Sequence, residues 1–263
     1  MRSNINEVPI QLYIANTEAL SEASTFDYWY ERASEDRRNK IDRMKNVADR
    51  IRSLSAGVLL QRAYHDLLSD SQWENYNLPQ DLPKIVVGKN QKPLFDLSDA
   101  NAASGASDLY FNLSHSGNSV ICAFSIKPVG CDVEQFYREE TSDDTSIDKR
   151  DKELLRKRKI AKRFFAESEN RYLEDDTDSF FERFTTIWTL KESVLKLTGD
   201  GIGYPLQSFS VIENNSVADK ITIDSYDESI FLKTYPSSGD VIFSCSGLHN
   251  SMPESPKYMD LRV

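Results

Sequence analysis

The sequence predicts a mixed fold of helices and strands in two similar halves, and three observations support this. Two stretches, Glu18–Tyr64 and Phe180–Leu197, carry apolar residues at helical spacing. Short apolar runs between turn residues predict strands before and after each helical stretch. The run Val120–Ser125 is echoed by Val241–Ser246, and each lies late in its half, after helices. We therefore expect two halves that meet near residue 129.

The composition is that of an ordinary globular protein. The chain has 263 residues, of which 39% are hydrophobic and 28% are charged. No apolar run approaches the ~20 residues of a membrane span, and Met1–Pro9 contains no apolar signal core. A formal net charge of −10 argues against binding to nucleic acid or to an anionic membrane. Cys122, Cys131 and Cys245 have no metal-type spacing, so we expect buried thiols in a reducing, cytoplasmic setting.

The first half is residues 1–129. It should open with a strand over Pro9–Ile14, followed by the helical stretch to Tyr64, broken once or twice. A basic run lies inside that stretch, and by itself it is most simply a solvated helix face: Asp36–Lys45, Arg50 and Arg52. Lys84–Val87 predicts a short strand, and Gly88–Phe95 predicts a turn that is either a phosphate or purine contact or a plain hairpin tip.

Further strands are expected around the middle of the chain, separated by turns. The predicted strands are Tyr110–Leu113, Ser119–Ile126 and Cys131–Gln135. The loops and turns between the elements are predicted at Ser98–Ser107, Ser114–Asn118 and Lys127–Gly130.

The second half is residues 130–263. Tyr137–Lys152 is rich in acidic and hydroxyl residues and predicts a solvated insertion, and Leu154–Phe165 predicts a basic helix. Gly199–Gly203 follows a helix instead of opening one, so it is not a dinucleotide-binding fingerprint. The remainder predicts strands at Phe209–Glu213, Lys220–Ile223, Ile230–Tyr235 and Val241–Ser246.

Three carboxylates form the strongest candidate for chemistry. Asp132 and Glu134 lie two apart on a predicted strand, so their side chains point the same way. Glu192 lies on the predicted helix Phe180–Leu197, on one face with Trp188 and Lys196. Three carboxylates together would suit Mg²⁺, which is held by a few such groups plus phosphates and water. The plain alternatives are solvated acids on an exposed strand and a surface Glu–Lys pair.

A histidine lies among hydroxyl residues in Asn112–Gly117. His115 next to Ser114 could serve nucleophilic catalysis, but the chain has no Gly-x-Ser-x-Gly elbow. The same pair suits phosphate binding. With three histidines in the chain, a histidine-rich metal site is not expected.

Taken in order, these segments resemble the signature of the 4'-phosphopantetheinyl transferases. The matching segments are Asn112–Gly117, Gly130–Glu134, Phe164-Phe165 and Trp188–Lys196, with Lys92-Pro93 and the basic run around Lys40 similar to earlier motifs of that family. The chain most resembles the two-half, monomeric type that activates peptide synthetases, polyketide synthases and related carriers. The resemblance runs from about Arg37 to Phe209, and its last two motifs are the specific ones.

The resemblance implies a role for each matching residue. The carboxylates match the family's Mg²⁺ ligands, and the last of them also matches its general base: Asp132, Glu134 and Glu192. Lys196 matches the lysine on the pyrophosphate of coenzyme A, so the implied catalytic residues are Glu192, Asp132 and Lys196. Ser114 and His115 match contacts on the 3'-phosphate side. Other nucleotide contacts are matched by Lys40, Lys92 and Pro93, and more loosely by Arg37 and Arg52. Trp188 and Lys191 should pack and orient the helix.

The implied fold is α+β, with two pseudo-symmetric halves that each pack a small antiparallel sheet on helices, and with the active site in the cleft between them. The implied reaction moves the 4'-phosphopantetheine arm of coenzyme A to a serine of an apo acyl, peptidyl or aryl carrier protein. It requires Mg²⁺ and releases adenosine 3',5'-bisphosphate. Two alternatives remain open at this stage: a metal-dependent phosphohydrolase acting on a nucleotide-like pyrophosphate, and a non-catalytic coenzyme A binding module.

The segment after Glu134 departs from the family pattern because of the acidic insertion, so no docking residue is carried over from it. The basic helix Leu154–Phe165 is our candidate for docking the carrier, with Phe164-Phe165 as an apolar anchor. The alternative is a solvated helix that pairs with the neighbouring acidic residues.

Overall fold

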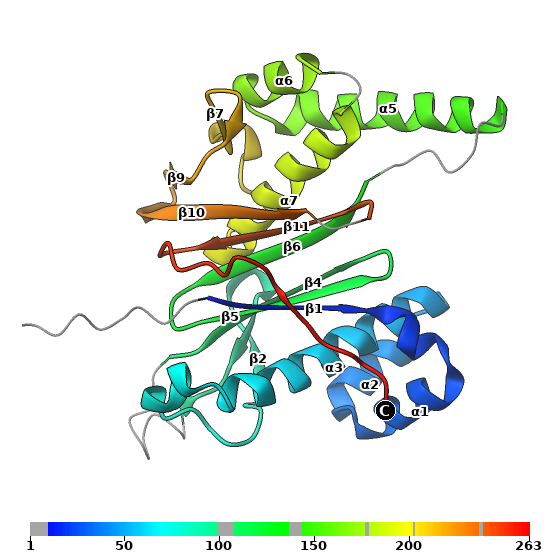
Figure 1. The fold of residues 1–263 in the computed structure, drawn as a ribbon, viewed down its shortest axis with the longest axis vertical. Helices are drawn as coiled ribbons and strands as arrows, with labels where there is room; N and C mark the ends of the chain where they lie inside the picture. Colours follow the sequence, from blue (N-terminus) through cyan, green and yellow to red (C-terminus); the bar gives the residue numbers. More distant parts are fainter. Residues whose placement is uncertain (1–9, 99–107, 137–143, 177–178, 202, 237–238) are drawn as a thin grey trace, which may run out of the picture.

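Two four-stranded sheets pack against each other at the centre of the molecule, and a long helix covers the outer face of each (Figure 1). These helices are α3 (Val47–Leu68) and α7 (Phe180–Thr198). The computed structural model describes residues 10–98, 108–136, 144–176, 179–201, 203–236 and 239–263. The α+β fold class expected from the sequence is confirmed.

The first sheet is built mainly by the first half of the chain, in the strand order β12-β1-β5-β4. Its strands are β1 (Gln11–Asn16), β4 (Tyr110–Ser116), β5 (Ser119–Ser125) and β12 (Lys257–Tyr258). β1, β5 and β4 pair antiparallel, whereas β12 pairs parallel to β1, so this sheet is not purely antiparallel. A separate hairpin joins β2 (Ile85–Val87) to β3 (Pro93–Phe95) through the turn η3 (Lys89–Gln91).

The predicted broken helix is a series of helices with clear caps between them. It comprises η1 (Thr17–Ser21), α1 (Ala23–Arg32), α2 (Glu35–Asp42) and α3, with η2 (Ser71–Tyr76) beyond. The breaks before α2 and before α3 fall at N-cap residues whose side chains bond the next helix. Ser34 Oγ accepts from the N–H of Arg37 at 3.3 Å, and Asn46 Oδ1 accepts from the N–H of Ala48 at 2.8 Å. Each cap satisfies an N–H that a new helix would otherwise leave unbonded.

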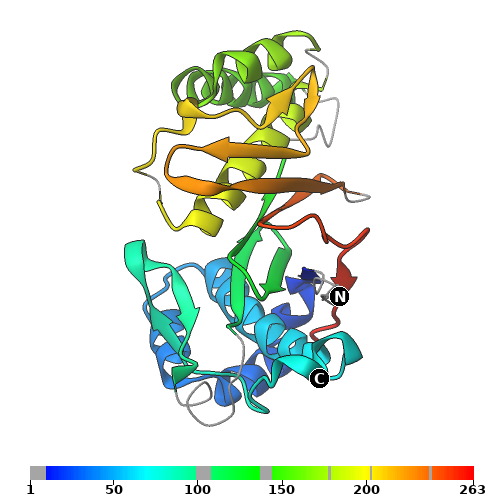
Figure 2. The ribbon, with the colours of Figure 1, turned by 90° about the vertical axis from the view of Figure 1, so that its left-hand side faces the viewer.

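The second sheet has the order β6-β11-β10-β9, and all its pairs are antiparallel. Its strands are β6 (Val129–Gln135), β9 (Lys220–Ile223), β10 (Tyr226–Pro236) and β11 (Val241–Gly247). The remaining elements of this half are α5 (Asp144–Phe164), α6 (Glu167–Glu174), η4 (Leu206–Ser208), β7 (Ile212–Glu213) and β8 (Ser216–Val217). Figure 2 shows α5 and α6 stacked beyond α7, at the far end from α3.

The alternation of side chains along the strands explains how the sheets pack. Leu12 and Ile121 from the first sheet share a buried cluster with Cys131, Val133 and Cys245 from the second. On β6, Gly130, Asp132 and Glu134 point the other way, toward α7, as residues two apart on a strand must. A Cβ at Gly130 would lie 1.9 Å from the backbone oxygen of Ser193 on α7, so only glycine allows this close approach.

The last residues return to the first half, which corrects part of the proposed division. The division 1–129 and 130–263 places them with the second sheet, but β12 adds to β1 instead (Figure 1). The Nε1–H of Trp29 donates to the backbone oxygen of Leu261 at 3.0 Å, and Lys257 Nζ lies 3.0 Å from Asp66 Oδ2. The sequence 251–263 has no strong strand pattern, so these anchors could not be foreseen from it. A boundary near residue 129 otherwise stays a proposal.

Three further expectations need correction. Ser114–Ser116 extends β4 instead of forming a turn, because the hairpin needs only Gly117, with a φ of 54°, and Asn118. Residues 144–152 are helical, since α5 begins at Asp144 and is favoured by Glu153 pairs with Arg156 and Lys157. Most of Phe209–Glu213 is not strand. The predictions for residues 1–9, 99–107 and 137–143 lie outside the described residues.

Candidate functional site

Helix α7 supplies the site with one carboxylate and one ammonium group. Its apolar residues face both the second sheet and α6, and they include Phe184, Ile187, Leu190 and Val194. Gly199 ends the helix in the left-handed region with a φ of 74°, and its N–H donates to the oxygen of Leu195 at 2.8 Å. The helix therefore holds its polar residues in fixed positions over β6.

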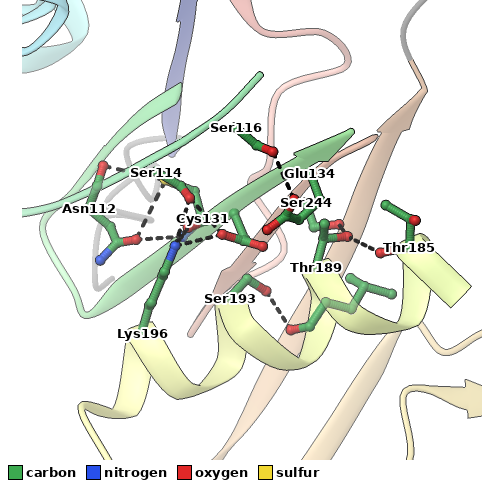
Figure 3. A network of polar contacts seen from close by, with 12 residues as sticks. Asn112, Ser114, Ser116, Cys131, Glu134, Thr185, Thr189, Ser193, Lys196 and Ser244 are labelled. Atoms are coloured by element: carbon green, nitrogen blue, oxygen red, sulfur yellow. Dashed lines mark hydrogen bonds and ion pairs between the residues drawn. The ribbon is translucent and has the colours of Figure 1, made fainter. Parts of the chain in front are cut away.

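Lys196 on α7 reaches Ser114 on β4 and so joins the two halves (Figure 3). Its Nζ lies 2.6 Å from Asp132 Oδ1 and 2.8 Å from Ser114 Oγ, and Ser114 Oγ donates to the same Asp132 oxygen at 2.6 Å. Burial is the largest single influence on the pKa of Lys196 and lowers it, but the charge and hydrogen bond of Asp132, with the charges of Cys131 and Glu192, together raise this pKa overall. The predicted residues Ser114, Asp132 and Lys196 are thus brought into direct contact.

Glu134 lies next to this contact on β6. Its Oε2 accepts from Ser116 Oγ at 2.8 Å. Burial raises the pKa of Glu134, the Ser116 hydrogen bond lowers it, and the charge of Asp132 raises it again, with a net upward shift. Ser116 is not among the predicted site residues, because the family resemblance assigns roles only to Ser114 and His115 in this segment. In a strand, its two-residue spacing from Ser114 would have placed it on the same face.

Glu192 is a carboxylate without a partner in the part of the chain that the structure describes. No hydrogen bond or ion pair reaches it there, and its side chain is half-buried. Burial raises the pKa of Glu192, and the neighbouring charges of Asp132 and Glu134 raise it further. A carboxylate of this kind is a stronger proton acceptor than an ordinary glutamate, and it is also disposed to bind a cation.

Within the described ranges, no three or more His, Cys, Asp or Glu side chains are placed to hold a metal ion by themselves. Carboxylates that are completed by substrate phosphates and water would still suit a magnesium ion. Both hydrogen bonds to Asp132 fall on Oδ1 and the one to Glu134 falls on Oε2, which leaves an oxygen of each carboxylate unbonded among these residues. Burial is the main cause that raises the pKa of Glu134 and of Glu192, and the charge of Asp132 adds to both shifts. An open set of carboxylates completed by phosphate and water is typical of Mg²⁺ sites.

Lys191 and Trp188 pack and orient α7, as expected. Lys191 is fully buried, with its Nζ 2.9 Å from Glu169 Oε2, and it donates to the backbone oxygens of Leu206 and Phe209 at 2.8 and 2.7 Å. These bonds occupy the backbone oxygens of Leu206 and Phe209. Oxygens that are bonded in this way do not pair with a strand, which fits the absence of a strand at Phe209. Trp188 stacks on Phe184, with the ring centroids 6.2 Å apart.

A cavity of about 250 Å³ opens between the β2–β3 hairpin and the C-terminal part of α7. The first half contributes residues of the hairpin and of β4, and the second half contributes α7 and the turn after it. The lining residues are Asn90, Gln91, Lys92, Pro93, Asn112, Leu113, Glu192, Leu195, Lys196, Gly199 and Gly201. The predicted residues Lys92, Pro93, Glu192 and Lys196 therefore share one cavity.

The hairpin tip is attached to the end of α7. Lys92 Nζ donates to the oxygen of Leu197 at 2.7 Å, and Asn90 Nδ2 donates to those of Gly199 and Asp200 at 2.7 and 3.1 Å. These carbonyls belong to the last turn of the helix and the residues after it, where backbone oxygens lack helical partners. Lys92 thus caps a helix at the cavity wall.

Lys92 is expected to make the stability of the protein depend on pH. Burial lowers its pKa from 10.5 to about 8, so between these values the unfolded chain binds a proton that the folded chain does not. Stability then rises as the pH increases from about 8 to 10.5. In Lys92→Met, this contribution should disappear. Urea unfolding of both proteins across this range checks it, and an identical pH dependence of the two would contradict the assignment.

Basic residues gather around His115. Partial burial lowers the pKa of His115, and nearby cations lower it further: Arg52, Lys196 and Lys40. Lys40 lies on α2 and is exposed, while Arg37 is more buried and donates to the oxygen of Ser53 at 2.9 Å. Arg52 pairs with Asp49 and Lys196 pairs with Asp132, whereas Lys40 has no carboxylate partner among the described residues. The positive charge of Lys40 therefore favours an anion beside the exposed ring of His115. Ser114 precedes His115 on β4 and faces Asp132, so its side chain lies on the opposite face of the strand from His115.

No helix in the described ranges is sufficiently long and apolar to cross a bilayer. The cysteines Cys122, Cys131 and Cys245 are buried free thiols, as expected.

The chain is similar in sequence to known proteins. The sequence model of the 4'-phosphopantetheinyl transferase superfamily matches residues 128–245, a segment that includes β6, α7 and most of β11. The chain is 29% identical over 223 residues to the 4'-phosphopantetheinyl transferase Sfp of Bacillus subtilis, covering 84% of each protein. It is 30% identical to the 4'-phosphopantetheinyl transferase gsp of Aneurinibacillus migulanus, over 73% of this chain and 66% of that protein.

A third relative has a higher sequence identity to this chain, over a shorter region. The 4'-phosphopantetheinyl transferase HetI of Nostoc is 40% identical over 113 residues, which is 42% of this chain and 39% of that protein. The family model spans the strand with Asp132 and Glu134 and the helix with Glu192 and Lys196, where the geometry places the candidate site. From this agreement between sequence and site, the chain belongs to the 4'-phosphopantetheinyl transferase superfamily and is an enzyme of that class.

Proposed function

We propose that this enzyme transfers the 4'-phosphopantetheine arm of coenzyme A to a serine of an apo carrier protein and releases adenosine 3',5'-bisphosphate. The observation that carries the proposal is the junction of the two halves at Lys196, Ser114 and Asp132, with the unpartnered Glu192 on the wall of the adjoining cavity. Positively charged groups that can bind an anionic substrate thus lie beside a carboxylate that can accept a proton.

The cavity and the basic group around His115 would hold coenzyme A. His115 and Lys40 would face its 3'-phosphate, and Lys196 its pyrophosphate. The neutral ring of His115 can donate an N–H, Lys40 carries a positive charge, and Asp132 pairs only with Lys196. Pro93 would pack against the nucleotide from the hairpin side of the cavity. Lys92 would contact the nucleotide as well, next to the helix end that it already caps.

Glu192 would act as the general base. The serine oxygen of the carrier forms a bond to the phosphorus that bears the pantetheine arm, the bond from that phosphorus to the nucleotide breaks, and Glu192 takes the serine proton directly or through a water. Its raised pKa suits this work, which is usually worth ~10²–10⁴-fold in rate. Lys196 holds negative charge on the leaving phosphate, a form of electrostatic stabilisation.

Asp132, Glu134 and Glu192 would hold a Mg²⁺ ion. When bound, this ion neutralises the charge of the carboxylates and of the pyrophosphate. One chain supplies every residue invoked here, so we propose that the enzyme acts as a monomer. Its buried free thiols suit a reducing cytoplasm.

Helix α5 remains our candidate for docking the carrier, with one change. Phe165 is 4% exposed and packs on Phe184 with centroids 5.1 Å apart, so it is part of the core and not an anchor for a partner. Leu155 is 59% exposed and lies among the basic residues of the same helix. The carrier would thus meet an exposed basic surface with Leu155 as the apolar contact.

Reversing the charge of Arg156, Arg158 and Lys162 to glutamate should raise the KM for the carrier and leave the affinity for coenzyme A unchanged. All three side chains are exposed, and Lys157 still pairs with Glu153 when Arg156 is reversed, so the fold should tolerate the change. Added salt should reduce the difference between the two proteins, because exposed charges are screened over ~8–10 Å at physiological ionic strength. Steady-state kinetics at low and high salt measure this. An unchanged carrier KM at low salt would place the docking surface elsewhere.

The reaction itself is tested by incubating the protein with coenzyme A, Mg²⁺ and an apo carrier, and then measuring the intact mass of the carrier. A gain of one phosphopantetheine arm supports the proposal. A metal-dependent phosphohydrolase would cleave coenzyme A and leave the carrier mass unchanged. A binding module without catalytic activity would leave both molecules unchanged.

A further inference from the structure

Two serines on β4 face two carboxylates on β6 across the junction of the two sheets (Figure 3). Ser114 Oγ donates to Asp132 Oδ1 at 2.6 Å, and Ser116 Oγ donates to Glu134 Oε2 at 2.8 Å. In both pairs the partners are 18 residues apart. The match arises because side chains two apart on a strand point to the same face. The first sheet thus holds the carboxylates that the second sheet supplies.

The oxygen of each serine also accepts a hydrogen bond from an N–H group. The proton of each hydroxyl is therefore directed to its other partner, the carboxylate. Ser114 Oγ accepts from Lys196 Nζ at 2.8 Å, and Ser116 Oγ accepts from the backbone N–H of Gln135 at 3.4 Å. A serine hydroxyl has a single proton to donate, and in both residues it is directed to a carboxylate oxygen. The two serines are therefore used in the same way.

We propose that Ser116 is a positioning residue for the magnesium carboxylates, acting on Glu134 as Ser114 acts on Asp132. The inference rests on the proposed function, since it assigns Glu134 to the metal. It gives a role to a residue outside the coenzyme A contacts and the carboxylate set.

The hydroxyl of Ser116 would fix Glu134 in two respects. Its bond occupies Oε2 and, among the described residues, leaves Oε1 free to bind a cation. It also connects the carboxylate to β4, whose register with β5 is fixed along its whole length. Residues that orient metal ligands in this way typically contribute 10–100-fold to metal affinity, so about tenfold is the expected effect of losing the hydroxyl.

The test measures the binding of Mn²⁺, as a probe for Mg²⁺, from the free Mn²⁺ signal in electron paramagnetic resonance with coenzyme A present. Ser116→Ala should weaken Mn²⁺ binding by about tenfold, while calorimetry without metal gives an unchanged affinity for coenzyme A. Ser116→Thr keeps the hydroxyl and should bind Mn²⁺ as the wild type does. Ser98→Ala is the matched control, because Ser98 Oγ donates to the exposed Asp96 carboxylate at 2.6 Å.

A second, kinetic test measures the Mg²⁺ concentration that gives the half-maximal rate of transfer. It should rise about tenfold in Ser116→Ala, with the maximal rate recovered at saturating Mg²⁺. An unchanged Mn²⁺ affinity in a folded Ser116→Ala protein would overturn the inference, as would an equal loss in Ser116→Thr. Because Mn²⁺ binding is measured without a carrier, its outcome is separate from the proposed function, which fails only if the wild type transfers no arm.

Discussion

Glu192→Gln is expected to lower kcat for transfer by ~10²–10⁴-fold, the usual contribution of a positioned general base. The amide has almost the same shape but cannot take a proton. No hydrogen bond or ion pair within the described residues depends on the carboxylate, so the fold should be unaffected. The affinity for coenzyme A should change much less than kcat, because the phosphates are held by Lys196 and the cations around His115.

Single-turnover rates and calorimetric affinities on the same sample separate these effects. Glu182→Gln is a suitable control, since Glu182 lies in the first turn of the same helix and is exposed. A large loss of coenzyme A affinity with an unchanged chemical rate would show that Glu192 has a purely binding role.

Asp132→Asn should reduce transfer by at least ~10²-fold, a loss comparable to removing one preorganised electrostatic group from an active site. Asp132 is 4% exposed and pairs with Lys196, so the alanine variant would leave a partly buried ammonium without its carboxylate. Asparagine keeps an oxygen to accept from Ser114 and Lys196 and removes only the charge. For this reason it tests the chemistry with less risk to the fold.

The melting temperature and circular dichroism of Asp132→Asn check that the protein is folded. Asp240→Asn provides a control, since Asp240 precedes β11 of the same sheet, is half-buried, and accepts through Oδ2 from Gln135 Nε2 at 2.6 Å. Near-normal turnover by folded Asp132→Asn at saturating Mg²⁺ would refute the role given to Asp132.

The sequence was informative where a local pattern decides the structure. Trp188, Glu192 and Lys196 lie on one face of a helix, as the helical spacing of the apolar residues in Phe180–Leu197 predicts. Asp132 and Glu134 share a face because strand side chains alternate. These patterns predict two pairs, Asp132 with Glu134 and Glu192 with Lys196, and the family resemblance predicts that the two pairs meet.

Contacts between distant segments could not be foreseen in this way. Ser116 reaches Glu134, and Lys92 reaches the end of α7 over 105 residues of sequence, because two sheets and a hairpin meet in space. The buried pair of Lys191 and Glu169 likewise decided that the Phe209 segment is not a strand. In each of these cases a side chain forms a hydrogen bond or an ion pair with a group that is distant in the sequence. Local propensities for helix and strand contain no information on such contacts.

The central claim is that a protein serine accepts the arm at this site. The most direct test measures release of adenosine 3',5'-bisphosphate from coenzyme A and Mg²⁺ with three additions: an apo carrier, the same carrier with its acceptor serine replaced by alanine, and no carrier. We predict release in step with the gain in carrier mass in the first reaction and none in the other two. Equal release in all three reactions, with no carrier modified, would contradict the account and indicate a phosphohydrolase.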